Sequence, residues 1–381
     1  MSCAFAVLFE AVFVDSEDST NMKGSDVTDS LLRSDQVRAL QSVLYNRTLV
    51  LCFGGGVDST AMLIALREAE LVPELILMAD TDAEKPETWE HVERIKSVLA
   101  DWEWPSVIIC KKTTQEATGY TDLEGNCLSN ETLPSLAFGM KSCSLKWKAA
   151  PQDAYIKGVR RGPNRRPPHP IWLRAQARGE KLVKLIGYDN GRADRRRAGA
   201  VDSAGADFDY AYPLQLIGWT RVDCVNAIMR SLGAEYVPIK SACFFCPASK
   251  EWELWWLVAA HPDLFERALL LERRALTGRH SRFNEVEFGA SWEDLVRNAD
   301  RFPSTTTTVG LGRSFAWNQW ARVHDVVDAD FKVRIEHRER FAQMADRLRR
   351  TTDNAFDSRA GLATTHGRCA RIAQQTELEL A

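Results

Sequence analysis

Short apolar runs alternate with longer amphipathic stretches through the first two thirds of the chain. Four runs have the length and composition of buried strands, and they span 49–53, 75–78, 107–110 and 182–186. Helical spacing of apolar residues predicts helices over 34–45, 86–99, 222–232, 262–274 and 330–350. Strands followed by helices through short loops predict an α/β fold with a doubly wound, mostly parallel sheet. In such a sheet, ligands bind beyond the carboxyl ends of the strands.

The same pattern divides the chain into four predicted parts. Residues 1–33 are polar and weakly patterned, so we expect a flexible extension there. An α/β nucleotide-binding domain is expected over 34–240, and a cysteine-containing helical subdomain over 241–289. Residues 290–381 are expected to form a helical C-terminal region with a disordered tail.

Composition is that of an ordinary globular enzyme. The 381 residues are 45% hydrophobic and 27% charged, and the net charge of −3 gives the whole molecule no strong attraction to nucleic acid. We find no signal peptide and no apolar run long enough to span a membrane, so we expect a cytoplasmic protein without a membrane partner. Nine cysteines in a chain this long do not suggest a disulfide scaffold.

A glycine loop follows the first predicted strand, where 54–60 reads Gly-Gly-Gly-Val-Asp-Ser-Thr. Glycines let the backbone turn sharply and approach a ligand, and the free N–H groups of a helix start attract anions. The loop is therefore a candidate phosphate site. It lacks the lysine of a Walker A loop and the spacing of a dinucleotide fingerprint. The alternative is a strand-to-helix turn that binds nothing.

Four stretches together resemble the phosphoadenosine-phosphosulfate (PAPS) reductase family of PP-loop ATP pyrophosphatases. They are the glycine loop, Ala79–Thr88, the Cys143/Lys146/Pro151 segment and Cys243-Phe-Phe-Cys246-Pro. The resemblance covers about residues 36–275, and the glycine loop is similar to that of the DndC-like branch. It implies the HUP-like fold of the adenine nucleotide α-hydrolases, with five parallel strands between two helical layers. It also implies binding of ATP or an adenylated sulfonucleotide with Mg²⁺.

The resemblance assigns candidate roles to residues at the predicted strand ends. Asp58, Lys146 and Arg197 are the expected catalytic residues, although Asp58 equally suits a helix cap. Lys148, Arg195 and Arg196 are further candidates for binding phosphate or sulfate. The expected nucleotide-binding residues are Gly54, Gly55, Gly56, Ser59, Thr60, Asp80, Glu84, Gly187 and Asp189.

Cys143, Cys243 and Cys246 occupy positions where cluster-bearing members of the family ligate a [4Fe–4S] cluster. Such a cluster normally takes four thiolates, but Ser144 stands where the cluster-type reductases have a second cysteine. Cys127 could supply the fourth ligand, or one iron could stay open. A C-x-x-C pair is equally half of a zinc site, and three reduced thiols are the remaining alternative.

The segment 157–181 is rich in proline and arginine, which suits either a nucleic-acid backbone or a solvated loop. Trp172 could stack on a base, whereas Trp252, Trp255 and Trp256 are expected in the core.

Three functions remain open from the sequence. The first is adenylation of an acceptor for sulfur transfer, with nucleic acid as the acceptor and a cysteine desulfurase or another protein as the sulfur donor. The second is a sulfonucleotide reductase that makes sulfite, which would need a nucleophilic cysteine near the C-terminus, where only Cys369 stands. The third is a non-catalytic nucleotide-sensing subunit of a phage-related modification or defence system.

Overall fold

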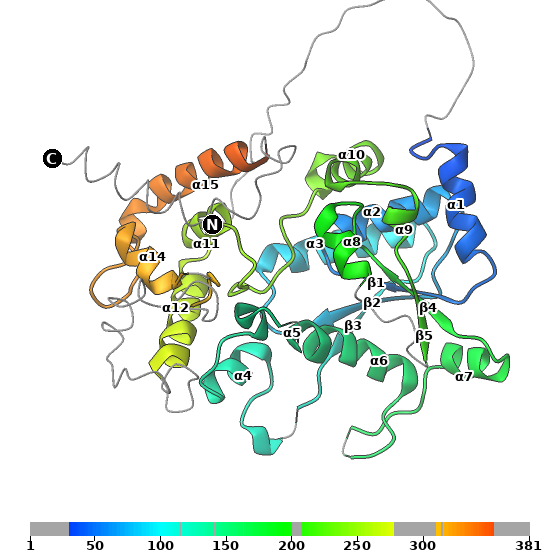
Figure 1. Cartoon of the computed structure of the whole chain (residues 1–381), viewed down its shortest axis with the longest axis horizontal. Coiled ribbons are helices and arrows are strands. Elements are labelled where there is room, and N and C mark those ends of the chain that lie inside the picture. The colour runs from blue at the N-terminus through cyan, green and yellow to red at the C-terminus, as the bar shows by residue number, and fades with distance from the viewer. Residues whose placement is uncertain are drawn as a thin grey trace, which may run out of the picture.

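The computed structural model describes residues 30–114, 116–140, 142–162, 164–199, 207–277, 310–313 and 315–353. Nearly all of the predicted extension over 1–33, the predicted tail, the boundary at 289 and Cys369 lie outside these residues. The described part of the chain forms a parallel sheet with helices on both faces and a group of helices beyond one end of the strands (Figure 1).

Five parallel strands form the sheet in the order β3-β2-β1-β4-β5, which confirms the predicted fold class. They are β1 (Leu49–Cys52), β2 (Leu75–Asp80), β3 (Val107–Lys111), β4 (Leu182–Ile186) and β5 (Phe208–Ala211). The chain adds β2 and β3 on one side of β1, and β4 and β5 on the other. The direction of winding therefore reverses between β1 and β4, which is where open α/β sheets bind their ligands.

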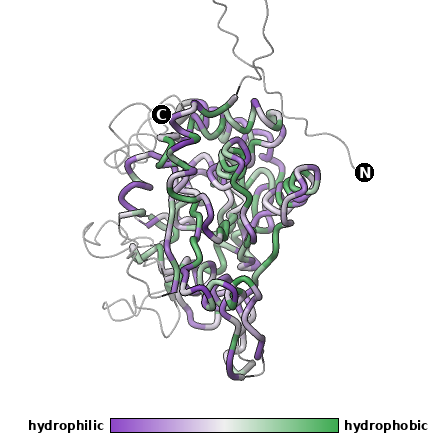
Figure 2. The backbone as a smooth tube through the Cα atoms, turned by 90° about the vertical axis from the view of Figure 1, so that its right-hand side faces the viewer, coloured by the Kyte–Doolittle hydropathy of each residue, from purple (hydrophilic) through white to green (hydrophobic). Residues whose placement is uncertain are grey.

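Side chains of each central strand alternate between two apolar cores, one on each face of the sheet. In β1, Leu49 and Leu51 point to one core and Val50 to the other. Helices on the first face are α1 (Ser34–Leu44), α2 (Val57–Glu68), α3 (Pro86–Asp101), α9 (Pro213–Leu216) and α10 (Arg221–Ser231). The second face is covered by α6 (Ala150–Lys157) and α7 (Pro170–Ala177). Figure 2 shows hydrophobic stretches running through the middle of this arrangement.

A third core joins the C-terminal helices to a short helix from the middle of the chain. It contains α4 (Leu123–Ser129), α11 (Glu251–Ala260), α12 (Pro262–Thr277), α14 (Trp317–Val323) and α15 (Arg338–Asp353). Trp255 is buried there against Trp320, as the sequence predicts for the core. No helix among the described residues is long and apolar enough to cross a membrane.

The last predicted helix begins eight residues later than expected, at Arg338. The side chain of Asp328 accepts hydrogen bonds from the backbone N–H groups of Asp330 and Lys332, at 2.9 and 2.8 Å. These bonds stabilise a turn and so compete with helix formation over the first part of the predicted segment.

Candidate functional site

The glycine loop lies at the carboxyl end of β1, between that strand and α2. Gly55 has φ +66°, and a Cβ atom there would lie 3.0 Å from Cγ2 of Thr88, so the loop conformation requires glycine. The Ser59 hydroxyl donates to the Gly56 carbonyl at 3.0 Å. The buried Thr60 hydroxyl donates to the same carbonyl and contacts His91 Nε2 at 2.9 Å. Thr60 thus supports the loop from inside, while the exposed Gly54 lies on the solvent side.

Gly187 brings the end of β4 against the glycine loop. A Cβ atom at Gly187 would lie 3.0 Å from the Ser59 backbone nitrogen and 3.1 Å from the Asp58 carbonyl carbon. Two residues later, Asp189 accepts a hydrogen bond from the Gly191 N–H at 2.7 Å, which fixes the turn. The two loops at the switch point are therefore packed backbone to backbone.

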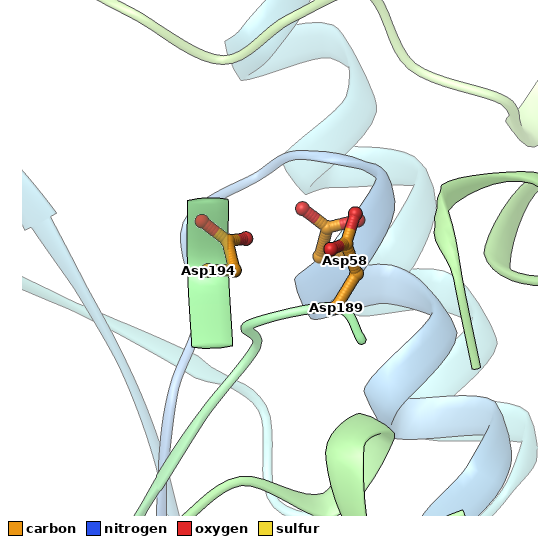
Figure 3. Close-up of side chains that lie close together, drawn as sticks. All are labelled: Asp58, Asp189 and Asp194. Carbon is orange, nitrogen blue, oxygen red and sulfur yellow. The ribbon is translucent and has the colours of Figure 1, made fainter. Parts of the chain in front are cut away.

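Three carboxylates meet beside this contact. Asp58, Asp189 and Asp194 each offer an oxygen within 4.8 Å of the others, and Asp194 projects from α8 (Arg192–Ala198) toward the other two (Figure 3). Burial raises the pKa of Asp58 and of Asp194. The charge of Asp189 raises both further, and that of Asp194 also raises the pKa of Asp58. Asp194 is absent from the residues that the sequence singled out. The sequence could have indicated it, because Asp194 lies in the first turn of the helix that follows β4.

Two arginines balance part of this charge. Arg221 Nη1 donates to Asp58 at 2.6 Å, and Arg197 Nη1 donates to Asp194 at 2.7 Å. Arg192, Arg195 and Arg196 of α8 are exposed, and their side chains form no hydrogen bond or ion pair with other residues in the described part of the chain. Arg197 is therefore held by an aspartate, whereas its neighbours are available to an anion at the rim.

The Glu84 carboxylate is hydrogen-bonded within its own turn, and its backbone pairs with Cys243. Its carboxylate accepts from the Thr81 N–H at 3.0 Å and from the Thr81 hydroxyl at 2.9 Å, and its side chain is 2% exposed. Asp80 is half-buried at the end of β2 and accepts from the Asp82 N–H at 2.7 Å. Of these two predicted nucleotide-binding carboxylates, Asp80 is thus the more open to a ligand.

The cysteine loop 241–246 lies across the ends of β1 and β2. A Cβ atom at Gly56 would lie 2.6 Å from the Ser241 hydroxyl, and Cys243 pairs with Glu84 in an antiparallel bridge. The Cys243 sulfur lies 3.5 Å from the Thr81 hydroxyl, and burial raises the pKa of this thiol to about 12. The glycine loop and the C-x-x-C pair are therefore neighbouring parts of one site.

Lys148 lies beside Glu84 and Cys243, whereas Lys146 lies on the side of Cys143. Its ammonium lies 3.6 Å from Glu84, and the charges of Cys243 and Glu84 raise its pKa against the effect of burial. A π-helical turn over Leu145–Ala149, between α5 (Ser142–Ser144) and α6, sets this register. Lys146 is exposed and lines a cavity of about 220 Å³ together with Cys143.

The basic segment 157–181 is largely paired. Arg174 contacts Glu74 and Arg178 contacts Glu180, while Trp172 packs on Phe208 with ring centroids 5.5 Å apart. Trp172 is therefore engaged with the sheet face and is not a free stacking platform. Arg160, Arg161 and Arg165 remain exposed, around the hairpin in which Val159 pairs with Arg166.

No protein-family model and no curated protein matches the sequence. Among solved structures, the chain is similar to phosphoadenylyl-sulfate (PAPS) reductase from Candida auris in a phosphate complex. The two share 15% identity over 51% of this chain and 79% of that chain, with a TM-score of 0.31. It is also similar to the U34-tRNA thiolase NcsA from Methanococcus maripaludis with its [4Fe-4S] cluster. That match has 11% identity over 68% of this chain and 80% of that one, with a TM-score of 0.33.

One of these two structures is a PAPS reductase, which is the family that the sequence motifs resemble. Neither match bears on the DndC-like branch, which stays a prediction. At such low identities and TM-scores, no residue role is transferred from either protein, and the site is argued from the contacts of this chain.

Proposed function

We propose that this chain is a PP-loop enzyme that binds ATP, or a ready-made adenylated sulfonucleotide, and adenylates an acceptor for sulfur transfer. The observation that carries the proposal is the glycine loop at the reversal point of the sheet, packed against Gly187 and flanked by three aspartates. Backbone N–H groups at such a loop and the start of α2 suit phosphate oxygens. This arrangement supports nucleotide binding more directly than any single side chain does.

The three aspartates fit Mg²⁺, which takes one or two protein carboxylates together with phosphate oxygens and water. Asp189 is the first ligand we assign, because it has no ion pair within the described residues. Asp58 is the second, and it would exchange its partner Arg221 for the ion, while Asp194 keeps Arg197. When bound, the ion would neutralise charge on the phosphates. The raised pKa of Asp58 fits this role, because a buried carboxylate beside two others gains most from an added cation.

Adenylation would proceed by attack of an acceptor oxygen on the α-phosphorus. A new P–O bond forms, the bond between the α-phosphorus and the bridging oxygen breaks, and pyrophosphate leaves with the electron pair, while the acceptor proton goes to water. The chain would contribute mainly by positioning the two reactants and by stabilising the charge on the phosphates. Arg195 and Arg196 lie where they could hold an anionic acceptor or the leaving pyrophosphate.

The thiols of Cys143, Cys243 and Cys246 are candidate ligands of a metal centre, either an iron–sulfur cluster or a single zinc ion. In a tetrahedral zinc site with zinc–sulfur bonds of about 2.3 Å, the sulfurs lie about 3.8 Å apart. Over the described ranges, no three cysteine sulfurs lie within 4.8 Å of one another. Cys143, Cys243 and Cys246 would hold the cluster, which would supply electrons or a binding point for sulfur.

An anionic acceptor such as nucleic acid suits the unpaired arginines of α8, and the sulfur would come from a cysteine desulfurase or another donor protein. The test is pyrophosphate release from ATP and Mg²⁺, with and without total tRNA or sheared DNA. We expect release to rise at least tenfold with one of these acceptors and to fall at least tenfold in Asp189→Asn.

The matched control is Asp209→Asn, which removes a carboxylate of β5 that pairs with Arg47. We expect this variant to keep the wild-type rate. ATP binding without pyrophosphate release under any of these conditions would refute adenylation of these acceptors and favour nucleotide sensing.

A further inference from the structure

A stacked pair of tyrosines lies at the carboxyl ends of β4 and β5. The rings of Tyr188 and Tyr212 are inclined by only 6°, with centroids 5.6 Å apart, and both side chains are partly exposed. Tyr188 stands between Gly187, which packs on the glycine loop, and Asp189. The pair is therefore next to the candidate nucleotide site, and the proposed function uses neither ring.

The tyrosine pair is also in contact with α8. The Tyr212 hydroxyl donates to the carbonyl of Ala198, the last residue of that helix, at 3.5 Å. Arg195 is three residues before Ala198, so the two are neighbours on the helix surface. Burial raises the pKa of the Tyr188 hydroxyl and the charge of Arg197 opposes this, which agrees with a ring close to α8. The aromatic pair and the arginine-rich helix thus adjoin each other.

The exposed arginines of α8 form a stripe on one side of the helix. Arg192 is three residues from Arg195 and four from Arg196, which makes the three neighbours on the helix surface. Asp194, which points toward the other two aspartates in Figure 3, is about 200° of helical rotation from Arg192 and from Arg196. The stripe therefore faces away from the aspartates and toward a partner outside the nucleotide site.

We propose that α8 and the tyrosine pair bind the acceptor as a single strand of nucleic acid, with phosphates on the arginine stripe and a base stacked on the tyrosines. The inference rests on the nucleic-acid acceptor of the proposed function and narrows it to strands with unpaired bases. Aromatic side chains stack on bases that are free of a duplex, while arginines contact the backbone whatever its sequence. Because Tyr188 precedes Asp189, a strand held there would bring one nucleotide beside the bound ATP.

The experiment measures binding of fluorescent RNA and DNA oligonucleotides to the full chain by fluorescence anisotropy, without ATP. Single strands of about 20 nucleotides, longer than typical single-strand sites of about 4–16, are compared with the corresponding duplexes. Inorganic polyphosphate is the competitor without bases. We expect single strands to bind at least about tenfold tighter than duplexes, and polyphosphate of equal charge to compete at least about tenfold more weakly than an unlabelled strand.

The tyrosine variants test the stacking. Tyr212→Leu should weaken binding of single strands at least about fivefold, whereas Tyr212→Phe, which keeps the ring, should bind them like wild type. The matched control is Tyr45→Leu, which removes a tyrosine that is 66% exposed at the end of α1 and should leave the affinity unchanged. Melting temperatures show whether each variant is folded.

The arginine variants test the stripe independently, because they replace exposed side chains that the fold does not need. The double variant Arg192→Gln and Arg196→Gln should lower the slope of log affinity against log salt concentration by about 1.4, since each phosphate contact of a single strand contributes about 0.7. Arg38→Gln, which changes an exposed arginine of α1, should leave the slope as it is.

Equal affinity of wild type for single strands and duplexes would overturn the proposal, as would equal competition by polyphosphate or wild-type affinity in a folded Tyr212→Leu. An unchanged salt slope in the arginine double variant would equally refute it. Failure of the proposed function looks different. Pyrophosphate release with an acceptor that is not a single strand, together with no strand binding, would remove only this surface, whereas strand binding without any pyrophosphate release would keep the surface and refute adenylation.

Discussion

Gly187→Ala tests whether the site depends on close backbone packing between the ends of β1 and β4. The added Cβ would meet the Ser59 backbone nitrogen at 3.0 Å, the Ser59 Cα at 3.1 Å and the Asp58 carbonyl carbon at 3.1 Å. All three atoms belong to the first turn of α2, so no side-chain rotation relieves the contact. The helix start, the glycine loop or the turn before Asp189 has to move.

Overpacking of this kind costs about 1–3 kcal/mol. For a domain of about 150–250 residues, each kcal/mol lowers the melting temperature by about 2–4 °C. The displaced N–H groups would also lose alignment with the nucleotide phosphates. We expect affinity for ATP and Mg²⁺ to fall at least tenfold, which corresponds to about 1.4 kcal/mol of binding free energy.

Calorimetric titration with ATP and Mg²⁺ measures the affinity, and thermal denaturation measures the stability. Gly199→Ala is the matched control, because a Cβ there would have its nearest neighbour at 3.6 Å, an ordinary contact, and the residue ends α8 with φ −66°. Wild-type affinity in Gly187→Ala, with a melting temperature within about 1 °C of wild type, would refute the argument that this close approach shapes the site.

Three further predictions concern stability. Burial lowers the pKa of His91 to about 4 from an ordinary 6.5, so the neutral ring stabilises the fold fully above pH 6.5 and this contribution is lost as the pH falls toward 4. The unfolding free energy contributed by His91 falls by about 2 kcal/mol between pH 7.5 and pH 5. Urea unfolding at these two pH values should show the loss. His324 has a similarly lowered pKa of about 4, so His91→Gln should remove about half of the pH-dependent loss that the two histidines cause together. Glu272→Ala leaves the buried N–H groups of Leu311, Trp317 and Asn318 without their acceptor and should lower the unfolding free energy by at least about 3 kcal/mol, whereas the exposed Glu90→Ala should change it by less than about 0.5 kcal/mol in the same urea titration. Lys148→Met should lower the melting temperature more than Lys146→Met, since the buried Glu84 carboxylate loses its neighbouring cation only in the first variant; equal shifts would contradict the contact.

Apolar runs predicted β1 to β4. The strands β1, β2 and β4 lie inside the sheet and are almost fully buried, whereas β3 is an edge strand whose residues Val107 to Cys110 are nevertheless all apolar. The family resemblance implied a fifth strand, but the apolar pattern did not locate it, because two of the four residues of β5, Asp209 and Tyr210, are polar and only partly buried.

The glycine-loop side of the candidate site was predictable because it is local. Glycines and aspartates that follow two parallel strands must meet at one rim, and Asp58 and Asp189 do so. The thiol side depends on tertiary packing. The π-helical turn that turns Lys148 toward Glu84, and the packing of α4 that brings Cys127 to the cavity, follow from contacts far apart in the chain. No local pattern of residues encodes either of them.

Because Ser241 contacts Gly56, a ligand bound at the glycine loop can affect ligand affinity at the cysteine loop, and the reverse. A ligand that holds the glycine loop in this conformation also holds Ser241 and the segment that carries Cys243. The Phe244 N–H, which donates to the Ala83 carbonyl, anchors this segment to the turn after β2. If a bound nucleotide changes the affinity for the metal by some factor, the bound metal must change the affinity for the nucleotide by the same factor at equilibrium. If the chain binds a nucleotide and a metal as proposed, and both favour this arrangement of the loops, loss of the metal through oxidation would weaken nucleotide binding without any change at the glycine loop.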